Sequence, residues 1–340
     1  MSATAPQSDP ATPKPPQDLV TLQTHVLQRL RDRSDVNGSL SWLISALSIS
    51  AKIISSQLRR ARLEDILGAL GTENVQGERQ QKLDVIANDV LMRALGDREG
   101  VAVVASEEAA EPVVLTDHLG GERGYCVLFD PLDGSSNIDV CGGVGTIFSI
   151  VHQDRRKPRV EASVLQHGAQ QVAAGYVLYG SSTVFVLTLG DGVDMFVLDP
   201  AIGAFIRVAE RLQIPEGTRS YSLNEGHRQG FPQGYRDYLD WAQGNGYSGR
   251  YAGAMVADVH RTLLKGGVFV YPPTDKAPRG KLRLLYEANP MAMLVEQAGG
   301  LAMAAPGAPI MQVEPTELHQ RTPVILGSRG EVERVLSFLG

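Results

Sequence analysis

Acidic residues closely follow two apolar segments of this 340-residue chain, in a pattern that could hold a hard cation. Glu107-Glu108 follows the apolar run 101–105, and Asp130-Pro131-Leu132-Asp133 follows the run 125–129. Acids at strand ends project into the crevice where α/β sheets bind ligands. Carboxylates from separate loops, together with the Leu132 carbonyl, could give Mg²⁺ the oxygen ligands it prefers. Each acidic pair alone is more typical of an exposed turn, so both interpretations stay open at this point.

The loop after Asp133 favours the metal interpretation, because it is suited to holding a phosphate. Gly134-Ser135-Ser136-Asn137 is small and rich in hydrogen-bond donors. Glycine lets backbone N–H groups converge on an anion, and the two hydroxyls add further donors. Acids that hold metals, followed directly by a loop that holds a phosphate, would form one coherent site.

The elements that must position these residues can be predicted from the hydrophobic pattern. Helices are expected from near residue 18, where leucines and valines recur at helical spacing, and then over 38–59 and 81–95. Strands are expected over 101–105, 125–129, 145–151, 184–189, 193–198 and 204–208. A second unit begins near residue 211, with strands at 219–223 and 268–271 and helices at 232–243, 253–265, 290–298 and 331–339. Helices interleaved with strands predict a layered α/β architecture.

Composition narrows the class of protein. The length suggests two domains or one large α/β unit, and 43% hydrophobic residues are enough for a sizeable core. A net charge of -6 argues against a nucleic-acid partner, and it requires local cations or metal at any site for an anionic substrate. The two cysteines, Cys126 and Cys141, cannot form a disulfide framework or a zinc site.

The sequence predicts neither export nor a membrane span. Residues 1–17 are rich in proline and polar residues and predict a disordered tail without the apolar region of a signal peptide. The stretch 162–190 lacks charged residues, but glycines and glutamines interrupt it, so we interpret it as buried core rather than a membrane span. A cytoplasmic location is expected.

The run from Phe129 to Asp139, FDPLDGSSNID, resembles the signature of the class I fructose-1,6-bisphosphatases, within the lithium-sensitive sugar phosphatase superfamily. Other segments resemble that family in order, from about residue 37 to the end of the chain. They are Gln76-Gly77-Glu78, Lys82–Val85, Ala105–Glu108, Tyr221–Gly226, Arg250–Arg261, Tyr271-Pro272 and Gly280–Ala292.

The resemblance implies a fold and an activity. The fold would be the layered α-β-α-β-α sugar phosphatase fold, with subdomains over 18–208 and 209–340 and the active site between them. The activity would be magnesium-dependent hydrolysis of the 1-phosphate of fructose 1,6-bisphosphate by metal-activated water, giving fructose 6-phosphate and phosphate. The family also implies a homotetramer in carbohydrate metabolism, whether in gluconeogenesis or in the Calvin cycle.

The resemblance also assigns roles to residues. Two or more Mg²⁺ ions, or Mn²⁺, would be held by Glu107, Glu108, Asp130, the Leu132 carbonyl, Asp133 and Glu287. Glu287 is expected just ahead of a helix, with Asn289 as its cap and Pro290 in the first position. Asp84 and Glu108 would handle the attacking water, and Glu78 would lie in a mobile catalytic loop.

The substrate residues fall into two groups. Asp133, Gly134, Ser135, Ser136 and Arg283 would contact the reacting phosphate. The second phosphate would bind to Asn224, Tyr251, Tyr271 and Lys281, with Arg250 supplied by a neighbouring subunit. Lysine offers a point charge, arginine a forked donor and tyrosine a rigid hydroxyl, all of which suit a phosphate.

The sequence departs from the family pattern in three places. Position 78 is Glu where the family usually has Asp. In the region that binds the family's inhibitor AMP, the phosphate-binding segment reads Asn37-Gly38-Ser39-Leu40-Ser41, and two typical cations are replaced by Gly124 and His152. AMP inhibition is therefore expected to be weak or absent. No cysteine-rich insertion is present in the sequence, so thiol regulation is not expected.

Three alternative functions stay open. A sedoheptulose-1,7-bisphosphatase, or a dual enzyme, would use the same chemistry in a pocket of different size. An inositol-monophosphatase-like enzyme would not need a second cationic pocket, so Arg250-Tyr251 and the 281–287 segment argue against it. A non-catalytic phosphosugar sensor is disfavoured, because such a protein should have lost metal ligands.

Overall fold

The computed structural model describes residues 19–340 except positions 65, 74–78, 97, 117–123 and 158. The predicted tail and Glu78 therefore lie outside the described residues. The centre of the molecule is an eight-stranded sheet in the order β10-β9-β8-β7-β6-β5-β3-β4. Its strands are β3 (Val101–Ser106), β4 (Val113–Val114), β5 (Tyr125–Asp133), β6 (Val144–His152), β7 (Gln171–Tyr179), β8 (Thr183–Thr188), β9 (Val193–Asp199) and β10 (Ala204–Ala209).

The apolar runs become strands because both faces of this sheet are covered. Every residue of β5 is buried, which explains why this strand reads as a continuous apolar run rather than an alternating one. β5 pairs in parallel with β3 and antiparallel with β6. The carboxyl ends of β3 and β5 therefore meet at one edge of the sheet, and they bring Glu107 and Asp130 to the same place.

A second sheet has six strands in the order β12-β11-β13-β18-β15-β16. These strands are β11 (Ser220–Ser222), β12 (Ser248–Gly249), β13 (Val268–Tyr271), β15 (Leu301–Ala305), β16 (Ala308–Pro309) and β18 (Val324–Gly327). Two short pairs complete the strands, β1 (Ala69–Glu73) with β2 (Arg79–Gln81) and β14 (Leu282–Arg283) with β17 (Arg321–Thr322).

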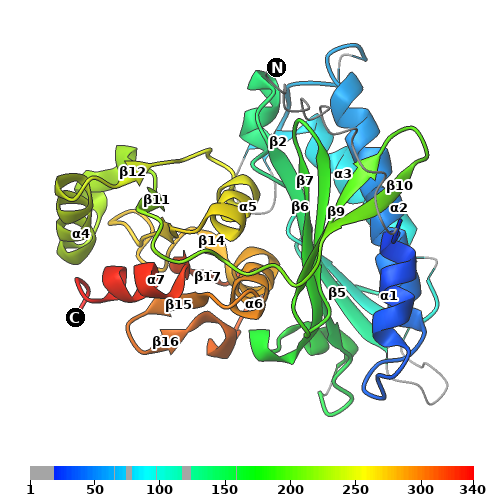
Figure 1. Cartoon of the computed structure of the whole chain (residues 1–340). Coiled ribbons are helices and arrows are strands. Elements are labelled where there is room, and N and C mark those ends of the chain that lie inside the picture. Colours follow the sequence, from blue (N-terminus) through cyan, green and yellow to red (C-terminus); the bar gives the residue numbers. More distant parts are fainter. Residues whose placement is uncertain (1–18, 65, 74–78, 97, 117–123, 158) are drawn as a thin grey trace, which may run out of the picture.

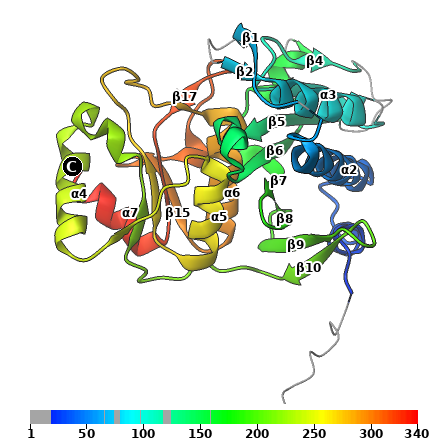
Figure 2. The same cartoon turned by 90° about the horizontal axis from the view of Figure 1, so that it is seen from above.

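The helices and the two large sheets stack in alternating α and β layers, as both views show (Figures 1 and 2). The outer layer on the large sheet holds α1 (Leu22–Leu30), α2 (Ser39–Arg60) and α3 (Lys82–Gly96). Between the sheets lie α5 (Met255–Lys265) and α6 (Asn289–Gln297), whose apolar faces pack on both. The far layer holds α4 (Gln233–Gly244) and α7 (Arg329–Leu336). The predicted α-β-α-β-α architecture is confirmed.

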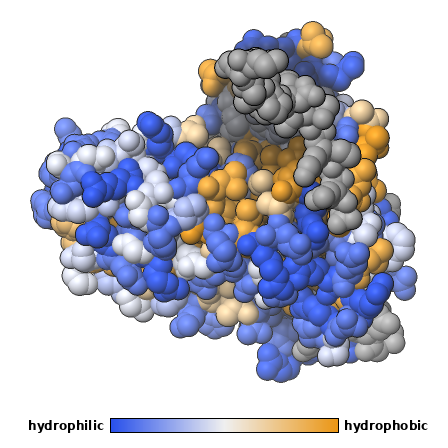
Figure 3. All heavy atoms as spheres, in the orientation of Figure 1, coloured by the Kyte–Doolittle hydropathy of each residue, from blue (hydrophilic) through white to orange (hydrophobic). Residues whose placement is uncertain are grey.

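The space-filling view shows how the layers meet at the surface. Apolar residues gather over α5 and the neighbouring ends of the large sheet, whereas the part of the molecule around α4 and β12 is mostly polar (Figure 3). The two cysteines are free, with Cys126 buried in β5 and Cys141 exposed. The stretch 162–190 is core, as predicted, although it also contains the long strand β7, which had not been predicted.

Other differences from the predicted elements have local causes. The first helix begins at Leu22 rather than near residue 18, because the Thr21 hydroxyl caps it by accepting a hydrogen bond from the Thr24 N–H at 3.1 Å. β15 and β18 had not been predicted, because β15 is short and rich in alanine and β18 has only four residues, so neither gives a periodic signal. Among the described residues, α2 alone is long and apolar enough to span a membrane. In its apolar 18-residue stretch, 56% is buried inside the molecule.

Candidate active site

A cavity of about 530 Å³ opens where the large sheet, α5 and the turn before α6 meet. Fourteen of the predicted site residues line it: Asp84, Glu107, Glu108, Asp130, Leu132, Asp133, Gly134, Ser135, Ser136, Tyr251, Tyr271, Lys281, Arg283 and Glu287. Asn224 and Arg250 do not line it. The lining also includes residues that sequence reasoning did not single out: Gln81, Gly253, Met255, Phe269 and Leu282. Their side chains carry no charge, so nothing in their residue type marked them.

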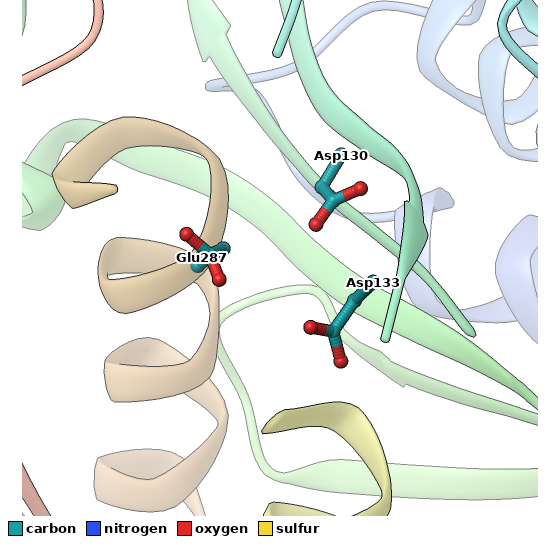
Figure 4. A group of neighbouring side chains, drawn as sticks. All are labelled: Asp130, Asp133 and Glu287. Carbon is teal, nitrogen blue, oxygen red and sulfur yellow. The ribbon is translucent and has the colours of Figure 1, made fainter. Parts of the chain in front are cut away.

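Three carboxylates come together at the floor of this cavity. Asp130 and Asp133 lie at the end of β5, and Glu287 faces them from the helical turn before α6 (Figure 4). One oxygen from each lies within 4.8 Å of the other two, and all three side chains are buried. The sequence separates Glu287 from Asp133 by more than 150 positions, so this contact arises from the tertiary structure.

The crowding of these acids shifts their protonation. Burial raises the pKa of Asp130 well above its usual value, and the nearby charges of Glu107, Asp133 and Glu287 raise it further. Burial and Glu287 also raise the pKa of Asp133 to about 7, although backbone N–H groups of Val256 and Met255 oppose that shift. Such acids gain little from water and repel one another, and a cation among them would relieve both costs.

Glu107 and Arg283 form a buried ion pair above the three carboxylates. The Arg283 Nη2 atom lies 2.8 Å from the Glu107 Oε1 atom, and both side chains are less than a tenth exposed. Arg283 lies in β14, and its Nη1 atom is 3.9 Å from Glu287 Oε2. This guanidinium partly neutralises the acids and places a forked donor at the cavity wall. Glu108, next to Glu107, is half-buried and lines the cavity.

The position of Glu287 differs from the one expected. Residues 284–288 form a wide helical turn, and α6 begins at Asn289 with Pro290 as its second residue. Glu287 therefore lies inside a helical turn rather than ahead of one, and Asn289 is not the cap. The Arg283 N–H donates to Glu287 Oε2 at 2.6 Å, which fixes the carboxylate toward the cavity. Wide turns of this kind occur often at functional sites.

The loop after Asp133 packs against the start of α5. Gly134 has φ +76°, and a Cβ atom there would lie 2.3 Å from the Ala254 Cβ, so only glycine fits. The Val256 N–H at the start of α5 donates to Asp133 Oδ2 at 2.6 Å. Ser135 and Ser136 open the short helical segment that follows and face the cavity. The loop and a helix N-terminus thus lie beside the acids, an arrangement that suits an anion.

Asp84 reaches the cavity from the first turn of α3. Its side chain is 4% exposed, and its Oδ2 atom accepts a hydrogen bond from the Gln81 N–H at 2.8 Å. It therefore sits in a fixed orientation beside the acidic floor, although it comes from another layer of the molecule.

The lining of the cavity also carries tyrosines and a lysine. Tyr251, Tyr271 and Lys281 line it, and the Lys281 side chain is exposed to solvent. Burial raises the pKa of Tyr251, and a hydrogen bond with Asn224 opposes this shift, so Asn224 contacts the tyrosine without lining the cavity itself. Arg250 is exposed, with its Nη1 atom donating to the Gly249 carbonyl at 3.3 Å.

The donor set fits a divalent metal ion. Every ligand that the acidic floor offers is a buried oxygen, the kind that Mg²⁺ and Mn²⁺ take, and no cysteine or histidine lines the cavity among the described residues. The single positive charge of Arg283 is not enough to neutralise the four neighbouring acids. Asp130, Asp133, Glu287 and Glu107 are thus the residues that could hold such ions, with Glu108 and the Leu132 carbonyl beside them.

This geometry predicts that metal and protons compete to stabilise the fold. The Asp133 pKa is raised in the folded state from 3.8 to about 7, so its contribution to stability is greatest at low pH and is lost as the pH rises toward 7. Calorimetry of the chelator-treated protein should therefore show a smaller rise in Tm on adding Mg²⁺ at about pH 5 than at about pH 8, since ligands must lose protons to bind metal.

Asp133→Asn is the matched variant, because it removes the titrating group. It should abolish most of the Mg²⁺ effect and flatten the pH dependence of the metal-free Tm. A Tm that responds to Mg²⁺ equally at both pH values, or equally in the variant, would contradict the assignment.

Comparison with known proteins places the chain in a family. Residues 20–210 match the family model described as fructose-1-6-bisphosphatase, N-terminal domain, and residues 214–340 match the corresponding C-terminal domain. Among solved structures, the chain is similar to fructose-1,6-bisphosphatase of Leishmania major in its holo form. That match has a TM-score of 0.88 and 41% identity and covers 94% of this chain and 99% of the other.

The same Leishmania major enzyme in its apo form and in its T-state matches with TM-scores of 0.83 and 0.83 and identities of 39% and 39%. Each match covers 94% of this chain, and they cover 99% and 98% of the solved chains. The two family models together span almost all the described residues, in the order that the resemblance of the sequence had indicated. The chain belongs to the fructose-1,6-bisphosphatase family.

Proposed function

We propose that this protein hydrolyses the 1-phosphate of fructose 1,6-bisphosphate. The observation that carries the proposal is that one cavity is lined both by an acidic floor of Asp130, Asp133 and Glu287 and by Lys281 and two tyrosines. A substrate with two phosphates fits this division, because one phosphate can be held through metal and the other through protein donors.

The chain's own residues supply positioning and proton transfer at the reacting phosphate. Bound magnesium, two or more ions in our proposal, would neutralise phosphate charge and make water more acidic. Arg283 and the backbone N–H groups of the Gly134–Ser136 loop orient the phosphate oxygens. Asp84 and Glu108, which approach from α3 and from the end of β3, accept the proton of the attacking water.

The second phosphate is assigned to Lys281, Tyr271, Tyr251 and Asn224. Arg250 is exposed and does not line the cavity of its own chain, which supports a role in the cavity of a neighbouring subunit. α2 also exposes Trp42, Ile49 and Ile53 at 61%, 43% and 42%, on one helical face, which suits an interface between copies. We propose a homotetramer on these grounds, together with the family expectation.

Three further assignments belong to the same proposal. We divide the chain into units over 18–208 and 209–340, with the boundary one residue before the end of β10 at Ala209 and ahead of β11 of the second sheet at Ser220. We assign a cytoplasmic location, for which the free thiols of both cysteines are suitable. We assign a role in carbohydrate metabolism, in gluconeogenesis or the Calvin cycle.

The first test measures phosphate release from three substrates, with and without Mg²⁺. Fructose 1,6-bisphosphate should turn over fastest, and chelation should abolish the reaction. Faster phosphate release from sedoheptulose 1,7-bisphosphate would instead identify the seven-carbon sugar as the substrate. Faster release from inositol 1-phosphate would show that no second phosphate has to bind at Lys281. Binding without release from any of the three would indicate a phosphosugar sensor.

Asp84→Asn tests the proton acceptor. We expect kcat for fructose 1,6-bisphosphate to fall by about 10²- to 10⁴-fold with little change in KM, the range typical of a lost general base. Asp89→Asn is the matched control, because Asp89 lies on the same helix and is exposed. If both variants lose activity equally, or neither does, Asp84 has no role in proton transfer.

AMP inhibition is expected to be weak. At the start of α2 the Asn37 N–H donates to the Tyr125 hydroxyl at 2.9 Å, and the His152 ring stacks on Tyr125 with centroids 5.0 Å apart. His152 Nε2 donates to the Asp35 carbonyl at 2.9 Å, so it offers no strong fixed cation to a nucleotide phosphate.

A titration of phosphate release with AMP should thus show no inhibition at micromolar concentrations. The double variant Gly124→Lys, His152→Arg should gain inhibition, because each added charge–phosphate hydrogen bond contributes about 1.5–3 kcal/mol. Micromolar inhibition of the unaltered protein would contradict the prediction.

A further inference from the structure

The segment 250–253 carries Arg250 and Tyr251 but is not part of any helix or strand. It connects β12 to α5, and Tyr251 at 41% exposure lines the cavity from it. An irregular segment cannot fix a side chain by its own backbone pairing, so the position of Tyr251 depends on what holds the neighbouring residues.

Asp258 holds this segment from behind. It lies in the first turn of α5 and is 2% exposed. Its Oδ1 and Oδ2 atoms accept hydrogen bonds from the Ala252 N–H at 3.0 and 3.1 Å, and Oδ2 also accepts one from the Gly253 N–H at 3.2 Å. Both carboxylate oxygens are thus used on the backbone directly after Tyr251.

The segment is held from the other side as well. Asn137, at the end of the loop that follows Asp133, donates through Nδ2 to the Ala252 carbonyl at 3.0 Å. Gly253 has φ +82°, a conformation that other residues rarely adopt, so the chain turns sharply directly after Ala252. Ala252 is therefore fixed through both its N–H and its carbonyl.

A buried carboxylate is costly, and the surroundings of Asp258 offset the cost. Burial raises the pKa of Asp258, while the Ser222 hydroxyl, the Ala252 and Gly253 N–H groups and the charge of Arg261 favour its ionised form. Asp258 does not line the cavity, so it does not touch a bound substrate. Its acceptors are committed to the segment that carries Tyr251.

We propose that Asp258 is a positioning residue for the second phosphate of the substrate: it fixes Tyr251 against Asn224 and thereby makes the site selective for sugar bisphosphates. The inference rests on the proposed function. The contacts that the segment makes with a phosphate at the far end of the sugar depend on Asp258, whereas the acids of the floor lie on other elements, β5 and the turn at Glu287.

The test compares two substrates that differ only in the second phosphate. In Asp258→Asn we expect kcat/KM for fructose 1,6-bisphosphate to fall about tenfold, mainly through KM, and kcat/KM for fructose 1-phosphate to stay within about twofold. Asp237→Asn, an exposed acid on α4, is the matched control and should change neither. Equal losses on both substrates would show a general defect at α5 and overturn the proposal.

A double-mutant cycle with Tyr251→Phe identifies the route of the effect. If Asp258 acts through Tyr251, adding Asp258→Asn to Tyr251→Phe should cost less than about twofold further for the bisphosphate, because coupled residues are not additive. Full additivity would overturn the proposal. Asp258→Glu keeps the charge but moves it, so it should also lower kcat/KM for the bisphosphate and not for fructose 1-phosphate. It replaces Asp258→Asn if that variant fails to fold.

Binding of fructose 6-phosphate, measured by calorimetry, separates this inference from the proposed function. The product carries the second phosphate and needs no turnover, so Asp258→Asn should weaken its Kd about tenfold relative to the unaltered protein. An unaltered protein that binds fructose 6-phosphate but releases no phosphate from the bisphosphate would refute the proposed hydrolysis alone. An unchanged Kd in an active protein would refute the role of Asp258 alone.

Discussion

Mutual repulsion among buried carboxylates is the constraint on which the rest of the structure depends. Asp130, Asp133 and Glu287 have oxygens within 4.8 Å of one another, and the pKa values of both aspartates are raised. Such a cluster opposes folding unless the surrounding elements are held firmly and some positive charge is near. Arg283, in its ion pair with Glu107, supplies part of that positive charge. The negative charge that stays unneutralised makes the cluster suitable for a divalent cation.

The five layers meet this constraint by holding each acid on a separate, well-packed element. β5 is buried along its whole length and carries both aspartates, whereas Glu287 lies on a turn that α6 anchors between the two sheets. The start of α5 donates to Asp133 and, through Asp258, also holds the segment that carries Tyr251. One helix therefore contacts both the acidic floor and the segment that carries Tyr251.

Much of the fold could be predicted, because its main strands are long apolar runs and its helices have a regular apolar face. Prediction failed where that signal was weak. β15 is short and rich in alanine, β18 has only four residues, and the turn at Glu287 has a wide helical geometry that residue types do not encode. In the candidate site, Gln81, Gly253 and Met255 were missed because uncharged residues show no chemistry until a cavity forms around them.

The sequence by itself determined the kinds of chemistry and the local geometry of single segments. Asp130 and Asp133 follow an apolar strand directly, and Gly134 permits the turn after them, so one end of the cavity was evident from neighbouring residues. Only the tertiary structure decided which distant groups meet. Glu287, Asp84 and Asp258 are each oriented locally, by a backbone N–H three to six positions away in the sequence, but they come from different layers. The contacts among these layers form only when the two sheets close on α5 and α6. Local spacing is a property of a short segment, whereas such contacts depend on how the whole core packs.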